Sequence, residues 1–555
     1  MMAAPVSAIF FAGCGSGCLV GAVLSAVWRR RTPTNPQDRS RRSLRVRLPA
    51  LPLPKSNLDG ESQQLAVDLD GGGAANIGDL HRLPSDPCMR ATRLYREPSL
   101  TPVRPNLTGS PRGLNRTIRR QASAQFTKNE LSVVEEKLVI VMVGLPARGK
   151  SFISNALLRY LNLLGCAARM FNAGSSRRSK GRAGATADFF DTSNAAAKQL
   201  REELAMQCLD SCIDFLKGCS MCAAVGILDA TNTTIERRCK VSRRVAEEGG
   251  IGLMFVESIC NDEALLQVNY KLKLANADYE GMEAATAMED FLQRVRRYEQ
   301  VYEPLQDEEE GEDRSYIKIV DAGVKLIKHR CTLDAKKQVP SHILTLLHSI
   351  HLGPRSIYFV VVGPTTNDVQ GFLGGDSPLT ARGEERMNKV AAYMSQREDD
   401  EPALVMSGTL QRHLQSAHLL KVAGTSSCPK ERTVLQLQRL NDLCLGSFDN
   451  MSAAEIQEYY PHEAAARARD KFNYRYPGEG GESYSDLVAR MREHILRLEQ
   501  LHGSALVLCD KRVCRVFLAY FRGTRLEEIP YIDVLWGVVQ FDRSHHGFDE
   551  IVIDI

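Results

Sequence analysis

Apolar residues along this chain form short continuous runs that alternate with stretches of helical periodicity. The run 138–143 has strand length, and it leads through a glycine-containing turn into 151–161, where apolar residues recur at helical spacing. Three further runs, separated by helical stretches such as 195–216 and 285–301, are Ala223–Leu228, Leu253–Val256 and Ile317–Val320. Strands that alternate with helices predict a parallel sheet covered on both faces.

A second unit of the same kind begins with the apolar run Ser356–Val362 and continues to Ile555. It contains another buried-strand pattern, Ala505–Cys509, and several amphipathic helices. We place the boundary between the two units near 352–355, after a helix around 341–350. At 555 residues the chain is long enough for each unit to have its own core.

The amino-terminal residues follow neither pattern. Residues 1–28 carry no charged side chain and are followed by Arg29-Arg30-Arg31, but four glycines dilute their hydrophobicity. Two interpretations of 1–31 therefore stay open, a membrane anchor with the arginines on the cytosolic side and a tail that does not insert. Residues 32–130 are rich in Pro, Arg, Ser and Gly, which predicts a disordered basic linker. We expect a cytoplasmic protein, tethered to a membrane only if 1–31 insert.

The net charge of +4 is unevenly distributed. Residues 29–128 hold 19 of the 71 Lys and Arg but only 8 of the 67 Asp and Glu, which leaves 52 basic and 59 acidic residues elsewhere. The basic excess therefore belongs to the tail. The folded part gives no electrostatic case for nucleic-acid binding.

A complete GxxxxGK[ST] phosphate loop stands between the first strand and the first helix. Its residues are Gly144, Leu145, Pro146, Ala147, Arg148, Gly149, Lys150 and Ser151. In such a loop the backbone N–H groups surround phosphates, the lysine reaches the β- and γ-phosphates and the hydroxyl binds Mg²⁺. A second strand ends at Asp229, where enzymes of this kind place a carboxylate that holds the metal or orients the acceptor hydroxyl. The sequence therefore predicts a site for a nucleoside triphosphate.

A set of motifs in a fixed order carries a family resemblance. After the phosphate loop come Phe171–Arg178, Asp229–Arg238, Phe255–Cys260, Ala277–Tyr279, Asp290–Arg294 with Tyr298, and Ser315–Asp321. From about Leu138 to Arg355 the chain closely resembles the kinase half of 6-phosphofructo-2-kinase/fructose-2,6-bisphosphatase. The ordered set is far more specific than the phosphate loop alone.

The resemblance implies ATP and Mg²⁺ as cofactors and fructose 6-phosphate as the acceptor, at its 2-hydroxyl. It places Asn269 and Lys273 in the nucleotide site, and it makes Lys150, Asp229 and Lys273 catalytic, with Ser151 and Asp229 at the metal. The residues implied to hold the sugar phosphate are Arg177, Arg201, Thr231, Arg237, Arg294 and Tyr298. Several guanidinium groups suit a phosphate dianion, because each can donate two parallel hydrogen bonds.

The second unit resembles the bisphosphatase half, which belongs to the phosphoglycerate-mutase-like histidine phosphatases. The motifs that carry this resemblance are Gly374–Gly383, Arg412, Leu440–Asp442, Arg475–Gly478 and Gly481–Tyr484. The implied fold class is α/β throughout: a P-loop kinase domain with a parallel sheet at 131–353, then a phosphoglycerate-mutase-like α/β domain at 354–555.

The residues of phosphatase chemistry are missing from that second unit. Its reaction needs an imidazole nucleophile, but the family's Arg-His-Gly-Glu is replaced by Val361-Val362-Gly363-Pro364. The second family histidine aligns with Asp510, and the acid-base glutamate aligns with Asp442. Valine has no lone pair to offer phosphorus, and we expect Asp510 and Asp368 to repel phosphate. The next histidine, His413, is expected at the surface.

Three functions follow from these observations. The leading one is a kinase without phosphatase activity that makes fructose 2,6-bisphosphate, a regulator of glycolysis. The alternatives are a bifunctional kinase/phosphatase, which Val362 argues against, and a non-catalytic membrane-tethered scaffold, which Lys150, Ser151, Asp229 and the arginines argue against. We expect the second domain to act as a structural or regulatory partner of the kinase, in a homodimer.

Overall fold

The computed structural model of the protein describes residues 43–47, 136–179, 187–190, 194–221, 223–276, 278–309, 312–331, 338–397, 402, 404–422, 433–544 and 546–555. The segment 1–31, with its two interpretations, and most of the linker 32–130 lie outside these residues. Among the helices of the described ranges, none is both long and apolar enough to cross a bilayer.

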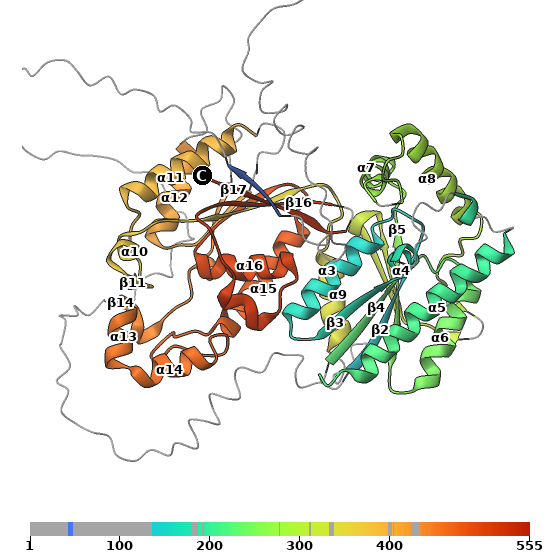
Figure 1. Ribbon diagram of the computed structural model, residues 1–555, viewed down its shortest axis with the longest axis horizontal. Helices are drawn as coiled ribbons and strands as arrows, with labels where there is room; N and C mark the ends of the chain where they lie inside the picture. Colours follow the sequence, from blue (N-terminus) through green and yellow to red (C-terminus); the bar gives the residue numbers. More distant parts are fainter. Residues whose placement is uncertain are drawn as a thin grey trace, which may run out of the picture. The chain divides into compact units, whose positions relative to one another are not determined.

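The first domain is built on a six-stranded sheet in the order β3-β4-β2-β5-β8-β9 (Figure 1). The strands are β2 (Glu136–Val143), β3 (Ala167–Asn172), β4 (Ala223–Asp229), β5 (Gly252–Ile259), β8 (Tyr316–Val320) and β9 (Lys325–His329). All neighbours pair in parallel except β8 and β9. The parallel sheet predicted from the apolar runs is confirmed, and it has one antiparallel edge strand in addition.

Side chains of β2 alternate between two cores, as a strand covered on both faces requires. Leu138, Ile140 and Met142 belong to one buried cluster, and the intervening valines belong to another. In Figure 1, α3 (Lys150–Leu163) and α9 (Val339–Ser349) cover one face, while α5 (Ala195–Gly218) and α6 (Ile235–Glu248) cover the other. The remaining elements of this domain are α4 (Ala173–Ser179), α7 (Glu263–Leu274), α8 (Ala284–Glu299), the 3₁₀ helices η3 (Ala187–Phe190) and η4 (Asp321–Gly323), and the small hairpin β6 (Glu308–Glu309) with β7 (Glu312–Asp313).

The second domain has a seven-stranded sheet in the order β1-β17-β16-β10-β15-β12-β13. Its strands are β1 (Ser43–Arg47), β10 (Ser356–Val361), β12 (Leu404–Ser407), β13 (Thr433–Gln436), β15 (Ala505–Cys509), β16 (Gly537–Arg543) and β17 (Phe548–Asp554). Strand β16 is antiparallel to both β10 and β17, and the other pairs are parallel.

Helices cover both faces of this second sheet. Helices α11 (Ala381–Ser395) and α12 (Gln411–Val422) lie on one face, and α15 (Tyr484–Gln500) and α16 (Lys511–Arg522) lie on the other (Figure 1). Shorter elements complete the domain: α10 (Thr366–Gln370), α13 (Ala453–Tyr459), α14 (Pro461–Arg469), the 3₁₀ helices η5 (Gln438–Leu440), η6 (Gly446–Phe448) and η7 (Leu526–Tyr531), and β11 (Phe372–Leu373) paired with β14 (Met451–Ser452).

Strand β1 corrects one expectation. It lies within 32–130, which the composition predicted to be disordered, but Ser43–Arg47 pairs in parallel with Glu550–Asp554 at the edge of the second sheet. The physical reason is that an edge strand offers a row of unpaired N–H and C=O groups, which a short extended segment can satisfy regardless of its composition.

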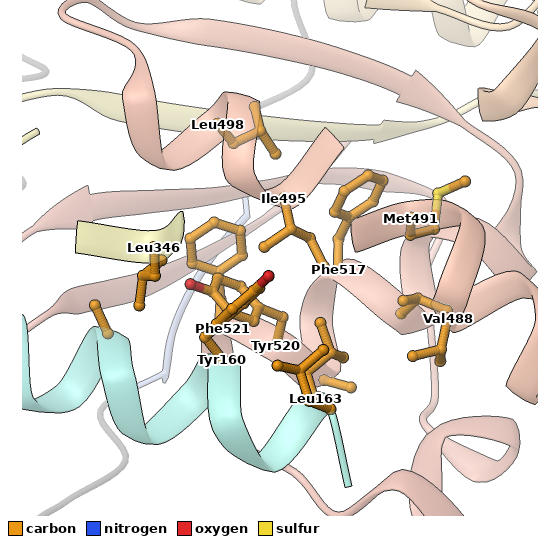
Figure 2. Packing of buried hydrophobic residues seen from close by; sticks show 14 of the residues in the cluster. Tyr160, Leu163, Leu346, Val488, Met491, Ile495, Leu498, Phe517, Tyr520 and Phe521 are labelled. Atoms are coloured by element: carbon orange, nitrogen blue, oxygen red, sulfur yellow. The ribbon is translucent and has the colours of Figure 1, made fainter. Parts of the chain in front are cut away.

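The two domains share one buried cluster. Figure 2 shows Tyr160 and Leu163 of α3 and Leu346 of α9 near residues of α15 and α16, among them Ile495 and Phe521. Beside these residues a fully buried carboxylate, Glu499, accepts hydrogen bonds from Arg159 at 3.0 Å, Arg355 at 3.0 Å and Tyr520 at 2.8 Å. The charge is therefore compensated from both domains, which is the condition for burying it.

Candidate active site

The phosphate loop has the backbone that its sequence requires. Gly144 has φ +130°, and a Cβ there would lie 2.5 Å from the Ser258 carbonyl oxygen. Gly149 has φ +85°, and a Cβ there would lie 2.8 Å from a methyl carbon of Leu352. Only glycine fits both positions. The loop ends at Lys150, where α3 begins, so the first-turn N–H groups of the helix face the bend.

The lysine and the serine of the loop are placed at one end of a cavity of about 290 Å³. The Lys150 ammonium donates to the Leu145 carbonyl oxygen. Burial, opposed by Asp229 and assisted by Lys273, lowers the pKa of Lys150 to about 7. The Ser151 hydroxyl donates to Asp229 Oδ2 at 2.7 Å. A hydroxyl and a buried carboxylate in contact match the oxygen ligands that Mg²⁺ prefers when phosphates supply the rest.

Asn172 belongs to this end of the site, although sequence reasoning did not assign it a role. It is the last residue of β3, and its side-chain amide donates to Asp229 Oδ2. The carboxylate of Asp229 thus accepts from both Ser151 and Asn172. Asn269 and Lys273 on α7 also line the cavity, and burial together with Arg294 lowers the pKa of Lys273 to about 8.

The six residues predicted to hold the sugar phosphate all line the same cavity. They come from separate elements: α4, α5, the turn after β4, α6 and α8. Phe190 of η3 packs against two of them, since the guanidinium carbon of Arg294 lies 3.7 Å from its ring centroid and the ring of Tyr298 lies 5.9 Å away. The structure therefore brings together residues that are up to 121 positions apart, from Arg177 to Tyr298.

Two carboxylates hold part of this arginine group. Arg177, which is buried, donates to Asp278 Oδ2 at 2.6 Å, and the same carboxylate lies 3.7 Å from Arg294. Arg237 makes a two-point ion pair with Glu202, at 2.7 and 2.5 Å. Asp278 stands in the motif Ala277–Tyr279, so a sequence signal for it existed, but its contact with the arginines was not foreseen.

The cavity as a whole is strongly positive. Its basic lining residues are Lys150, Arg177, Lys198, Arg201, Arg237, Lys273, Arg294, Arg297 and Arg543, and its acidic ones are Glu202, Asp229 and Glu236. Nine cations against three anions suit a ligand set with several phosphate groups.

Three residues of the predicted nucleotide set do not line the cavity: Gly144, Leu145 and Arg148. The Arg148 side chain turns away, donating to Tyr270 Oη at 3.2 Å and lying 3.6 Å from Glu299. Arg543 lines the cavity although it was not predicted to and although it belongs to the second domain. No sequence signal connected it to the phosphate loop.

The second domain contains a smaller cavity of about 160 Å³ where the lost phosphatase residues were predicted. Val362, Asp442 and Asp510 all line it, together with Arg412. Arg412 makes a two-point ion pair with Asp510, at 2.7 and 3.1 Å, and Arg512 donates to Asp442.

Two expectations about this cavity are wrong. His413 is fully buried, with Nε2 3.2 Å from Asp510 Oδ2, because α12 directs it inward with Ser416 and Ala417. Asp510 is not an unpaired charge that repels phosphate. Although burial opposes it, the charges of His413 and Arg412 keep the pKa of Asp510 below its usual value.

The third acid of this cavity, Asp368, is also engaged. It accepts from the Thr365 backbone N–H at 2.8 Å, in the capping box of α10.

Comparison with known proteins gives two family matches. A family described as 6-phosphofructo-2-kinase matches residues 126–350, and the histidine phosphatase superfamily (branch 1) matches residues 357–548. A 6-phosphofructo-2-kinase/fructose-2,6-bisphosphatase of Caenorhabditis elegans is 38% identical over 74% of this chain and 87% of its own length. Human 6-phosphofructo-2-kinase/fructose-2,6-bisphosphatase 1 is 37% identical over 76% and 83%. Saccharomyces cerevisiae 6-phosphofructo-2-kinase 1 is 32% identical over 75% and 53%.

Proposed function

Because the chain belongs to the 6-phosphofructo-2-kinase/fructose-2,6-bisphosphatase family, we propose that it transfers the γ-phosphoryl group of ATP to the 2-hydroxyl of fructose 6-phosphate. The product, fructose 2,6-bisphosphate, regulates glycolysis. The observation that carries the proposal is that five residues of the phosphate loop, among them Lys150 and Ser151, line one cavity together with Asp229 and four arginines. The family supports kinase activity, and the basic lining of the cavity supports two phosphorylated substrates.

The nucleotide is held at the phosphate-loop end. Backbone N–H groups of residues 147–149 and the first turn of α3 bind the phosphates, and Lys150 releases the Leu145 carbonyl oxygen to bind the β- and γ-phosphates. Ser151 and Asp229 would hold Mg²⁺, and the ion would supply positive charge that compensates the phosphate oxygens. Asn172 keeps the Asp229 carboxylate in place, and Asn269 contacts the nucleotide from α7.

The sugar phosphate is held at the arginine end. Arg177, Arg201, Arg237 and Arg294 bind the 6-phosphate, with Thr231 and Tyr298 beside the sugar. The 2-hydroxyl oxygen attacks the γ-phosphorus, the bond to the β–γ bridging oxygen breaks, and ADP leaves. The hydroxyl proton passes to Asp229 or to solvent, and Lys273 stabilises the charge of the transferring group.

We also propose that the second domain does not hydrolyse fructose 2,6-bisphosphate. Val362 occupies the position of the nucleophile and has no lone pair. Arg412 is engaged by Asp510 and Arg512 by Asp442, so the guanidinium groups that would hold a phosphate are already paired. His413 faces Asp510 and is not among the residues that line the cavity.

Two reactions of the full-length protein test this function. In the first, ATP, Mg²⁺ and fructose 6-phosphate are supplied, and we expect fructose 2,6-bisphosphate to form. In the second, fructose 2,6-bisphosphate alone is supplied, and we expect no inorganic phosphate. Formation of phosphate would overturn the loss of hydrolysis, and the absence of product in the first reaction would overturn the kinase proposal.

A single variant sharpens the second reaction. Val362→His restores an imidazole at the nucleophile position but leaves the ion pairs of Asp510 and Asp442 intact, so we expect it to release no phosphate. Hydrolysis by this variant would show that the ion pairs do not block the cavity.

A further inference from the structure

A turn of the second domain reaches the kinase cavity. Arg543, the last residue of β16, lines the cavity, and its Nη2 donates to Asn269 Oδ1 of α7 at 3.0 Å. Its guanidinium carbon lies 5.1 Å from the ring centroid of Phe152, in the first turn of α3. One side chain of the phosphatase-like domain thus touches both helices that border the nucleotide end of the cavity.

No carboxylate of the described residues forms an ion pair with this buried guanidinium. Arg543 is only 9% exposed, and its Nε and Nη1 have no hydrogen-bond partner among the described residues. Two neighbouring buried arginines differ from it, since Arg159 and Arg355 share the Glu499 carboxylate. Burial and the positive charge of Arg355 lower the pKa of Arg543 to about 10, so the group remains charged at neutral pH.

A buried cation with two unsatisfied donors is costly, and an anion in the cavity would remove that cost. The position of Arg543 indicates which anion. Lys150 defines the β- and γ-phosphate end of the loop, while Phe152 lies two residues farther along α3 and Asn269 lies on the opposite helix. The phosphate nearest the nucleoside would pass between them.

We propose that Arg543 binds the α-phosphate of the nucleotide, so that the phosphatase-like domain supplies one residue of the kinase's nucleotide site. This inference rests on the nucleotide site proposed above. It gives the second domain a direct part in substrate binding, independent of any chemistry in its own cavity.

A ligand series tests the contact without requiring turnover. The full-length protein and Arg543→Gln, which keeps a polar side chain near Asn269 but removes the charge, are titrated with adenosine, AMP, ADP and ATP. We expect AMP, ADP and ATP to lose a similar factor of affinity, about tenfold to a hundredfold, and adenosine to lose none. Equal losses for all three nucleotides locate the contact at the phosphate that they share.

Other outcomes of the series overturn the proposal. A loss confined to ATP would assign Arg543 to the γ-phosphate, and a similar loss for adenosine would assign it to the nucleoside. No loss at all would make it a packing residue against Phe152. Arg382→Met, which removes an exposed arginine of α11, is the matched control and should bind every ligand as the unaltered protein does.

Kinetics give a second readout. Arg543→Gln should raise KM for ATP and leave kcat and KM for fructose 6-phosphate unchanged, whereas general damage to the fold would change all three. Arg543→Lys keeps the charge and should recover part of the affinity for the nucleotides. If the glutamine variant does not fold, the lysine variant tests the phosphate contact in its place. If no sugar phosphate is turned over but the nucleotide series shows the expected losses, this contact stands and the proposed function fails.

Discussion

The two cavities of this protein are both rich in arginine, but they balance its charge differently. In the kinase cavity nine cations face three anions, and the carboxylates Glu202 and Asp278 hold only part of the arginine group. In the phosphatase-like cavity four cations face three anions, and the ion pairs of Arg412 and Arg512 lie inside it. The arginines of the kinase cavity are therefore less fully paired with carboxylates than those of the second cavity.

The largest effect is expected at the phosphate loop. Lys150→Met removes the charge that we propose binds the β- and γ-phosphates, so kcat/KM should fall by at least about a thousandfold. The rate of fructose 2,6-bisphosphate formation measures it. Lys217→Met, at an exposed position on α5, is the control and should retain full activity. Persistent turnover by Lys150→Met would mean that the loop does not bind the nucleotide.

The paired charges of the second cavity should matter for stability rather than for kinase turnover. Arg412→Met leaves the Asp510 carboxylate with only His413 as a partner, and breaking such a buried pair costs about 3 kcal/mol. Urea unfolding followed by the fluorescence of Trp536, in a Trp28→Phe background, measures the loss.

The double variant Arg412→Met with Asp510→Asn should recover most of that stability, because neither charge is then left alone. If Arg412→Met is as stable as the unaltered protein, the ion pair of Arg412 with Asp510 does not stabilise the fold. The difference in charge pairing between the two cavities would then have no energetic consequence.

Substitutions of two arginines in the kinase cavity should distinguish an effect on substrate binding from an effect on the stability of the fold. Arg237→Gln removes a proposed contact of the sugar phosphate. Its partner Glu202 is partly exposed, so KM for fructose 6-phosphate should rise about tenfold to a hundredfold with little change in stability. Arg177→Gln should raise KM similarly and also lower stability, because Asp278 is buried. Arg243→Gln, at an exposed position on α6, is the control. Unchanged KM values in both variants would remove the sugar phosphate from this end of the cavity.

The smallest effect is a proton taken up when the nucleotide binds. With a pKa of about 7, Lys150 is mostly neutral at pH 8 in the ligand-free protein, and the phosphates favour its charged form. Calorimetry of ATP binding in buffers with different ionisation enthalpies should show uptake at pH 8 that shrinks toward pH 6, and Lys150→Met should reduce it. Uptake that does not depend on Lys150 would contradict the lowered pKa.

The lowered pKa of Lys150 also determines how the stability of the ligand-free protein changes with pH. The folded-state pKa of Lys150 lies below the unfolded value, so the unfolded chain binds more protons between about pH 7 and 10.5. This group therefore makes the free energy of unfolding of the ligand-free protein rise with pH across that window.

The sequence predicted those parts of the site that consist of consecutive residues. The strand, the glycine-containing bend and the helix from Leu138 to Leu161 are contiguous. The motif that identifies them therefore also determines how they are arranged. The burial of His413 was also readable, because His413, Ser416, Ala417 and Leu420 recur at helical spacing and are all buried. The expectation that His413 lies at the surface is therefore wrong.

Other features depend on partners far away in the chain. Arg543 meets Asn269 across 274 positions, and β1 pairs with β17 across about 500, so nothing near either segment signals the contact. Whether Asp278 faces solvent or a group of arginines likewise depends on how α4 and α8 meet. Such features require the packed structure, because side-chain periodicity records which face is buried but not what it is buried against.

Glu499 has a consequence for how this gene could change over evolutionary time. Because its carboxylate neutralises Arg159 of the first domain, deleting the second domain would leave that buried guanidinium without its partner and would uncover the apolar surface around Tyr160 and Leu346. Substitutions in the cavity of the second domain, at Val362 for example, would leave the contacts of Glu499 intact. The residues of that cavity could therefore change one at a time while the kinase domain stays covered, whereas a shortened reading frame would expose it.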